Sequence, residues 1–206
     1  MTHQYFHGSI EVVCGPMFSG KTSELIRRVE RAQIAKQRVQ IFKPAIDIRY
    51  DKEGIVSHTS RTVKAEPVEN AVDILIRLKD STRVVAIDEV QFFDEAIVTV
   101  VVKLAARGYR VICAGLDLDY RAQPFGSMPM LLAVADEVMK IHAICTVCGA
   151  HATRTQRLSK SKAQVLLGET DAYEARCRGH YQHDEAEEQA LLPLEEEIRP
   201  LSEMSN

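Results

Sequence analysis

The loop GPMFSGKT, at residues 15–22, matches the phosphate-binding pattern G-x-x-x-x-G-K-[ST]. Its two glycines allow a tight turn, so that successive backbone N–H groups can converge on an anion. Lys21 would then reach the β- and γ-phosphates, and the hydroxyl of Thr22 would bind Mg²⁺. An apolar run precedes the loop and a helical pattern follows it, which is the context that this motif requires. The sequence therefore predicts a binding site for a nucleoside triphosphate.

Two adjacent acids, Asp88 and Glu89, follow the apolar run VVAI. A buried strand would deliver Asp88 beside the phosphate loop, where its carboxylate can bind Mg²⁺ directly or through water. Glu89 could act as a base on a substrate hydroxyl, which would make the protein a small-molecule kinase, or on water, which would make it an ATPase that drives motion or assembly. We favour the kinase because a net charge of −3 gives no sign of a basic track for a polymer. Arg27, Arg28 or Arg61 could still serve as arginine fingers in an ATPase.

Three cysteines and a histidine form a second motif, CTVC at 145–148 and CRGH at 177–180. Cys145, Cys148, Cys177 and His180 would complete a tetrahedral Zn²⁺ site with no open position, which is the structural rather than the catalytic pattern. His183 is an alternative fourth ligand, but the two-residue gap of the first pair favours His180. A redox pair in the first motif would leave the second motif unexplained. We therefore predict a zinc ion that clamps the ends of a long loop.

The composition suits one main domain with a small appendage: 206 residues, of which 46% are hydrophobic. The slight negative charge argues against a nucleic acid polymer or a membrane surface as a partner. The start of the chain lacks the pattern of a signal peptide, and no apolar run approaches the roughly 20 residues that cross a bilayer. We therefore expect a cytoplasmic protein whose cysteines are thiols or metal ligands.

Short β-branched runs alternate with longer helical patterns from residue 9 to residue 117. Because the runs are apolar throughout, they predict a parallel sheet covered on both faces by helices. The predicted strands are 9–14, 38–44, 83–89, 110–117 and 136–144, and the predicted helices are 21–36, 70–80 and 94–108. The pattern changes at Cys145, so we expect a nucleotide-binding domain at 1–144, a zinc-binding domain at 145–182 and an acidic tail at 183–206.

Four segments, GPMFSGKT, DEVQFF, AGLDLDYRAQPFG and the C-x-x-C…C-x-x-H pair, occur in this order within about residues 8–182. In this combination the chain resembles the thymidine kinases of the cellular type, or type II. The resemblance implies an α/β fold of the P-loop, RecA-like class, with a parallel sheet flanked by helices and a small zinc-binding lasso domain. It also implies transfer of the γ-phosphoryl group of ATP to the 5′-hydroxyl of thymidine, giving dTMP, with deoxyuridine as a second substrate. Members are usually homotetramers that dTTP inhibits.

The resemblance also implies roles for residues. Glu89 matches the catalytic base, and Asp88 matches the acid associated with Mg²⁺. The residues that match the ATP site are Gly15, Pro16, Met17, Phe18, Ser19, Gly20, Lys21, Thr22, Asp47, Arg49, Asp88 and Gln91. Those that match the thymidine pocket are Met17, Phe92, Leu116, Tyr120, Thr155 and Tyr173. We therefore expect thymidine and ATP as substrates, Mg²⁺ as the cofactor and Zn²⁺ as a structural ion.

The sequence departs from the family pattern in places. The lasso, at about residues 158–174, has a single glycine, Gly168, where relatives commonly carry a Gly-Gly pair, so its backbone clamp would close differently. Tyr120 stands where phenylalanine is common, which keeps a surface for stacking and adds a polar edge. His180 stands where many relatives have cysteine, a replacement that zinc accepts.

Overall fold

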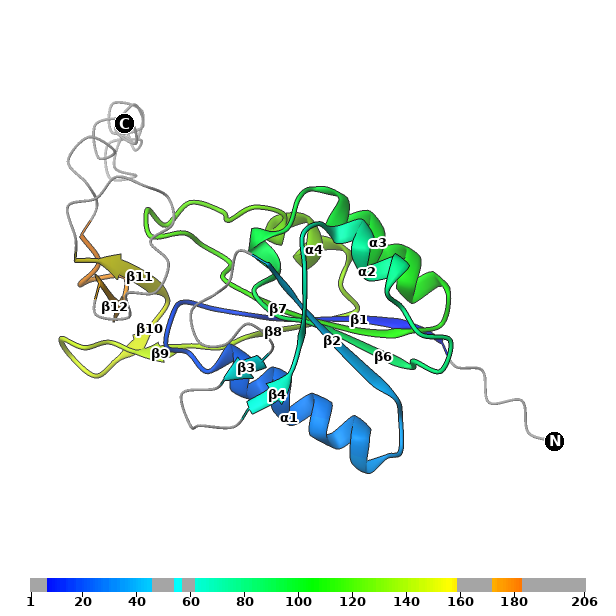
Figure 1. The fold of residues 1–206 in the computed structure, drawn as a ribbon. Coiled ribbons are helices and arrows are strands. Elements are labelled where there is room, and N and C mark those ends of the chain that lie inside the picture. The colour runs from blue at the N-terminus through cyan, green and yellow to red at the C-terminus, as the bar shows by residue number, and fades with distance from the viewer. Residues whose placement is uncertain (1–6, 46–53, 57–61, 159–171, 183–206) are drawn as a thin grey trace, which may run out of the picture.

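A six-stranded sheet forms the centre of the fold in the computed structural model (Figure 1), which describes residues 7–45, 54–56, 62–158 and 172–182. Its strand order is β5-β2-β6-β7-β1-β8, and every neighbouring pair is parallel. The strands are β1 (Ser9–Cys14), β2 (Val39–Pro44), β5 (Glu66–Val68), β6 (Val84–Ile87), β7 (Arg110–Gly115) and β8 (Glu137–Lys140). The predicted parallel sheet is therefore confirmed.

Helices cover both faces of this sheet (Figure 1). Helix α1 (Lys21–Ile34) lies on one face, and α2 (Ala71–Ile76), α3 (Ala96–Ala106) and α4 (Met128–Val134) lie on the other. Side chains of a strand point alternately to the two faces. Val85 and Ile87 of β6 therefore pack with α2 and α3, whereas Val84 and Ala86 pack with α1. This two-sided burial explains why the strands are apolar throughout.

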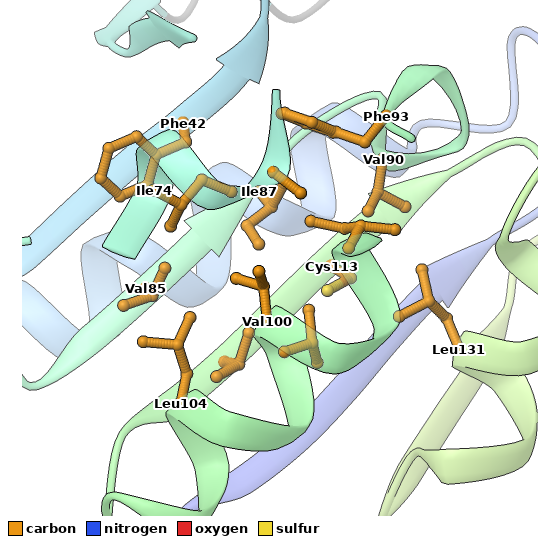
Figure 2. Packing of buried hydrophobic residues seen from close by; sticks show 14 of the residues in the cluster. Phe42, Ile74, Val85, Ile87, Val90, Phe93, Val100, Leu104, Cys113 and Leu131 are labelled. Atoms are coloured by element: carbon orange, nitrogen blue, oxygen red, sulfur yellow. The ribbon is translucent and has the colours of Figure 1, made fainter. Parts of the chain in front are cut away.

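The larger of the two core layers lies between the sheet and helices α2, α3 and α4 (Figure 2). Its labelled residues include Phe42 of β2, Ile87 of β6 and Leu104 of α3, of which each side chain is completely buried. Burial of one such side chain stabilises the fold by about 1.5–3 kcal/mol. Cys113 also lies in this layer, as a small apolar side chain of β7.

The segment 136–144 differs from its prediction as one strand. Strand β8 ends at Lys140, and the backbone N–H of Ile141 donates to the carbonyl of Cys14 at 2.8 Å. A separate strand, β9 (Ala143–Ile144), then pairs antiparallel with β10 (His151–Ala152). The pattern of apolar residues continues across this break, so the sequence could not reveal that the chain leaves the main sheet. The helix predicted at 70–80 is shorter and ends at Ile76.

The end of the described chain forms small antiparallel pairs. Strand β11 (Arg154–Arg157) pairs with β12 (Tyr173–Arg176), beside the β9–β10 pair. A core of small residues, Ala143, Cys145, Ala152 and Ala175, holds these strands together.

Two short elements occur earlier in the chain. Strand β3 (Gly54–Val56) pairs with β4 (Thr62–Lys64), and a short 3₁₀ turn, η1 (Val90–Phe92), follows β6. In the part of the chain that the structure describes, no helix is both long and apolar enough to span a bilayer.

A buried ion-pair network connects β1 to α1. Glu11 lies on β1 and is 7% exposed, and Arg28 on α1 is 5% exposed. Arg28 pairs with Glu11 and lies 2.8 Å from Glu24, while Arg110 Nη2 donates to Glu11 at 3.0 Å. Burial alone would raise the pKa of Glu11, but hydrogen bonds from Arg110 and Arg28 outweigh burial and lower it. A hydrogen bond from Arg27 is the largest cause that lowers the pKa of Glu24, to about 2.

We expect Arg28→Met to lower the free energy of unfolding by about 3–5 kcal/mol, because it removes the more buried of the two guanidinium groups that pair with the Glu11 carboxylate. Arg27→Met is the matched control, since Arg27 also pairs with Glu24 but its side chain is 50% exposed. Its cost should stay below about 1 kcal/mol. Urea unfolding of both variants at pH 7 measures the difference. Equal losses would contradict a special role for the buried pair.

The same network predicts a pH dependence. The folded-state pKa values of Glu11 and Glu24 lie below their ordinary values. Their contribution to stability is therefore complete above the unfolded pKa of about 4, and it is lost as pH falls from there toward 2. We expect the difference in stability between the wild-type protein and Arg28→Met to shrink over this range. A difference that stays constant from pH 6 to pH 3 would contradict the assignment.

Candidate active site

The phosphate-loop motif lies where β1 ends and α1 begins, as the sequence predicts. Gly15 has φ of +146°, and a Cβ atom there would lie 2.1 Å from the carbonyl oxygen of Ile141, so only glycine fits. Gly20 caps α1, and no side chain in the described residues caps the helix there. The N–H groups of the first turn and the positive end of the helix dipole thus face the loop, an arrangement that suits a phosphate.

Two side chains of the motif bond to the backbone of the loop itself. The ammonium of Lys21 donates to the carbonyl oxygen of Pro16 at 2.8 Å, and the hydroxyl of Ser19 donates to the same oxygen at 2.8 Å. Lys21 is 9% exposed, so its charge lies in a largely enclosed position. A loop rich in N–H groups with an enclosed cation can hold a triphosphate.

Asp88 and Thr22 meet across the edge of the sheet. Asp88 follows β6 directly and is 4% exposed. The hydroxyl of Thr22 donates to Asp88 Oδ2 at 3.2 Å. Two oxygens that bind Mg²⁺ at adjacent octahedral positions lie about 3 Å apart. The two side chains therefore fit one magnesium ion, either directly or through its water ligands.

Glu89 comes next in the chain and has an uncommon backbone conformation, with φ of 49° and ψ of 41°. Its N–H donates to Asp88 Oδ1 at 3.0 Å, and its Oε2 accepts a 2.6 Å hydrogen bond from Gln91 Nε2. A left-handed conformation costs a residue other than glycine about 1–2 kcal/mol and is found most often at functional sites. Glu89 thus has a strained backbone directly after the acid that fits a magnesium ion.

Aromatic side chains form a cluster near the loop. Tyr120 and Tyr173 are buried together with Ala172, and Met17 packs against them. The hydroxyl of Tyr120 accepts a 2.8 Å hydrogen bond from Arg121 Nε. Three of the residues predicted for the thymidine pocket are therefore in contact with one another, although they come from distant parts of the sequence.

The other pocket residues predicted from the sequence have separate contacts. The N–H of Met17 donates to Thr155 Oγ1 at 3.0 Å, which ties the phosphate loop to β11. Phe92 contacts Phe125 edge to face, with ring centroids 5.5 Å apart. Leu116 follows β7 and donates its N–H to Gln91. Asp47 and Arg49 lie outside the described residues, as do Arg61, His183 and most of the lasso.

Arg157 is a residue of this region that the sequence analysis did not select. Its guanidinium carbon lies 3.5 Å from the ring centroid of Tyr120, and its Nη2 donates to the hydroxyl of Tyr173 at 2.6 Å. Alternate residues of β11 are buried, so Arg157 shares the inward face of the strand with Thr155. That period of two is a signal that could have identified Arg157 once β11 was recognised as a strand.

Cys145, Cys148, Cys177 and His180 come together as predicted, with their ligand atoms all within 4.8 Å of one another. The Sγ atoms of Cys148 and Cys177 are 3.8 Å apart, and His180 Nδ1 lies 3.2 Å from Cys177 Sγ. Sulfur ligands at about 2.3 Å on a tetrahedral zinc ion would be about 3.8 Å apart. The four residues therefore fit a zinc ion.

Backbone hydrogen bonds in the cluster favour the thiolate form of Cys145. Burial raises the pKa of Cys145, but hydrogen bonds from the backbone N–H groups of Cys177, Cys148 and Val147 outweigh it and lower the value to about 6. A thiolate is the form that binds zinc, so these N–H groups favour the ligand form.

Comparison with known proteins agrees with the geometry. A family model described as thymidine kinase matches residues 8–181. A curated thymidine kinase of Bacteroides thetaiotaomicron is 54% identical to this chain over 174 residues, which make up 84% of this chain and 87% of the relative. The match extends from the strand before the phosphate loop to the last cysteine–histidine pair, so it includes every element of the site described above. This chain belongs to the thymidine kinase family.

Proposed function

We propose that this protein transfers the γ-phosphoryl group of ATP to the 5′-hydroxyl of thymidine, and also of deoxyuridine, to give the nucleoside monophosphate. One observation carries the mechanism: Glu89 directly follows Asp88, whose Oδ2 accepts a hydrogen bond from Thr22 of the phosphate loop. A base beside the metal-binding acid is placed to act on a hydroxyl that attacks the γ-phosphorus.

Different residues of the site bind the phosphates, hold the metal ion and accept the proton. The backbone of residues 15–20 and the charge of Lys21 hold the phosphates and compensate their charge. Mg²⁺, held by Thr22 and Asp88, would neutralise charge on the β- and γ-phosphates. Glu89 takes the proton of the 5′-hydroxyl as the new oxygen–phosphorus bond forms, and the bond to the β-phosphate breaks, with its electron pair leaving on ADP.

The nucleoside would bind next to the phosphate loop. Met17, Tyr120, Tyr173 and Thr155 are connected there by packing and by the Met17–Thr155 hydrogen bond. Aromatic rings offer flat surfaces for a nucleobase. Several further assignments rest on the resemblance to the family. They are the limits of the three domains, inhibition by dTTP, a homotetramer, a cytoplasmic location, and the roles of Phe92, Leu116, Asp47, Arg49 and Gln91.

Release of ADP tests the reaction itself. A coupled assay with ATP and no acceptor should give little ADP, and addition of thymidine should start rapid release. Each other deoxynucleoside is then tried in turn, with deoxyuridine expected to be active. Release that does not depend on an acceptor would instead indicate an ATPase.

We expect Glu89→Gln to lower kcat by roughly 10²- to 10⁴-fold, because the amide cannot accept the proton. The KM for ATP should change little, since the phosphate loop is intact. Glu95→Gln is the matched control, because Glu95 is an exposed acid six residues along the same segment. Steady-state kinetics, with ATP and thymidine varied in turn, measures kcat and both KM values. Near-normal turnover of Glu89→Gln would refute its role as the base.

Removal of zinc should mainly weaken the binding of the nucleoside. The ligand Cys145 packs with Ala175 of β12, which pairs with β11, and β11 carries Thr155. His180→Ala, or treatment with a chelator, should therefore raise the KM for thymidine far more than the KM for ATP. His151→Ala is the control, as His151 is an exposed histidine outside the cluster. Metal analysis should find one zinc per wild-type chain, and an equal rise in both KM values would show that the metal supports the whole fold.

A further inference from the structure

Gln91 is enclosed at the edge of the sheet, and both ends of its amide are bonded. It is 3% exposed and lies in η1, two residues after Glu89. Its Oε1 accepts the N–H of Leu116 at 3.0 Å, and its Nε2 donates to Glu89 Oε2 at 2.6 Å. A backbone N–H can only donate, so Oε1 must face Leu116 and the NH₂ group must face the carboxylate.

The surrounding backbone leaves room for this side chain and little else. A Cβ atom at Gly115 would lie 2.6 Å from Gln91 Oε1. At Gly126, whose φ is +50°, a Cβ atom would lie 2.5 Å from the carbonyl oxygen of Gln91. Two glycines, one at the end of β7 and one in the segment between β7 and α4, therefore permit the backbone to close around Gln91. A side chain enclosed in this way has one conformation, so it can fix the position of the group to which it is bonded.

Two hydrogen bonds within the described part of the chain hold Glu89 in place. Its backbone is in the left-handed region with its N–H bonded to Asp88, and one carboxylate oxygen is bonded to Gln91. A carboxylate with χ angles that rotate freely would reach the productive position only part of the time, whereas one that is anchored at Oε2 presents Oε1 in a constant direction.

We propose that Gln91 is a positioning residue for phosphoryl transfer, which holds the Glu89 carboxylate so that Oε1 receives the proton of the nucleoside hydroxyl. This inference rests on the proposed role of Glu89 as the base. As the hydroxyl oxygen bonds to the γ-phosphorus, its proton passes to Oε1 and the electron pair of the broken bond leaves on ADP. Gln91 neither gains nor loses a proton. Gln91 therefore acts through Glu89, and this role replaces the contact with ATP that the resemblance to the family implies for it.

The bond to Leu116 gives this arrangement a second consequence. Leu116 is a predicted contact of the nucleoside, and its N–H fixes the far end of the Gln91 amide. One side chain thus connects the segment that holds the base to the segment that would hold the nucleoside. The distance between the Glu89 carboxylate and the 5′-hydroxyl of the nucleoside then depends on the two hydrogen bonds of the Gln91 amide.

A double-mutant cycle with Glu89→Gln tests the proposal. Gln91→Met has a similar length but forms neither hydrogen bond, and we expect kcat to fall about 10- to 100-fold, with the KM for ATP changed less than about twofold. In the double variant Glu89→Gln/Gln91→Met, kcat should equal that of Glu89→Gln within about twofold, because Gln91 has no base left to position. Gln123→Met, at an exposed glutamine, is the control and should match the wild-type enzyme.

The outcomes separate this inference from the proposed function. If Glu89→Gln keeps near-normal turnover, the role of Glu89 fails. If Glu89→Gln is slow but Gln91→Met is as fast as wild type, only the role of Gln91 fails. Losses that multiply in the double variant, together with a raised KM for ATP, would show that Gln91 binds the nucleotide, and would overturn the proposal.

A second variant covers the case in which Gln91→Met does not fold. Gln91→Asn keeps the neutral amide but is shorter by one methylene group, so it cannot reach both the N–H of Leu116 and the carboxylate of Glu89. Its melting temperature should stay within a few degrees of wild type, while its kcat should fall about as far as that expected for Gln91→Met. Wild-type turnover in this variant would overturn the proposal.

Discussion

Parallel pairing of β6, β7 and β1 is the constraint on which the site depends. Ile87 pairs with Cys113, and Cys113 also pairs with Val12, so these three residues form one row across the sheet. Because the strands are parallel, all three end at the same edge. Asp88 is the next residue of β6, and the phosphate loop begins just beyond β1. A shift of one residue in either ladder would exchange the side chains that pack on α1 with those that pack on α2 and α3, so close packing on both faces keeps this edge in register.

A hydrogen bond connects the phosphate loop to the small unit that contains β11 and β12. The N–H of Met17, in the phosphate loop, donates to Thr155 of β11 at 3.0 Å. Strand β11 in turn pairs with β12, which packs against Cys145 of the proposed zinc cluster. The core of this small unit consists of alanines and cysteines, which bury little apolar surface. A metal ion is a physical means to hold such a unit against the phosphate loop.

Two arrangements of buried polar side chains in this fold have specific partners. Glu11 and Arg28 neutralise each other between β1 and α1, and Gln91 uses both ends of its amide. An unsatisfied buried group would cost several kcal/mol, so each of these arrangements restricts the chain to one conformation. The left-handed backbone of Glu89 is tolerated because Asp88 and Gln91 bind it from two sides. Order at the site is therefore maintained by the same hydrogen bonds that satisfy buried groups.

The sequence by itself determined the α/β class, the phosphate loop, the acids after β6 and the four members of the cysteine–histidine cluster, because each depends on local spacing or on a continuous apolar run. Tertiary structure decided what local patterns do not contain. It showed that β8 and β9 belong to different sheets, that Arg157 lies over Tyr120, and that the amide of Gln91 joins Glu89 to Leu116. These contacts join residues from separate segments or depend on the path of the backbone between them, and spacing along the chain carries no information about such distances.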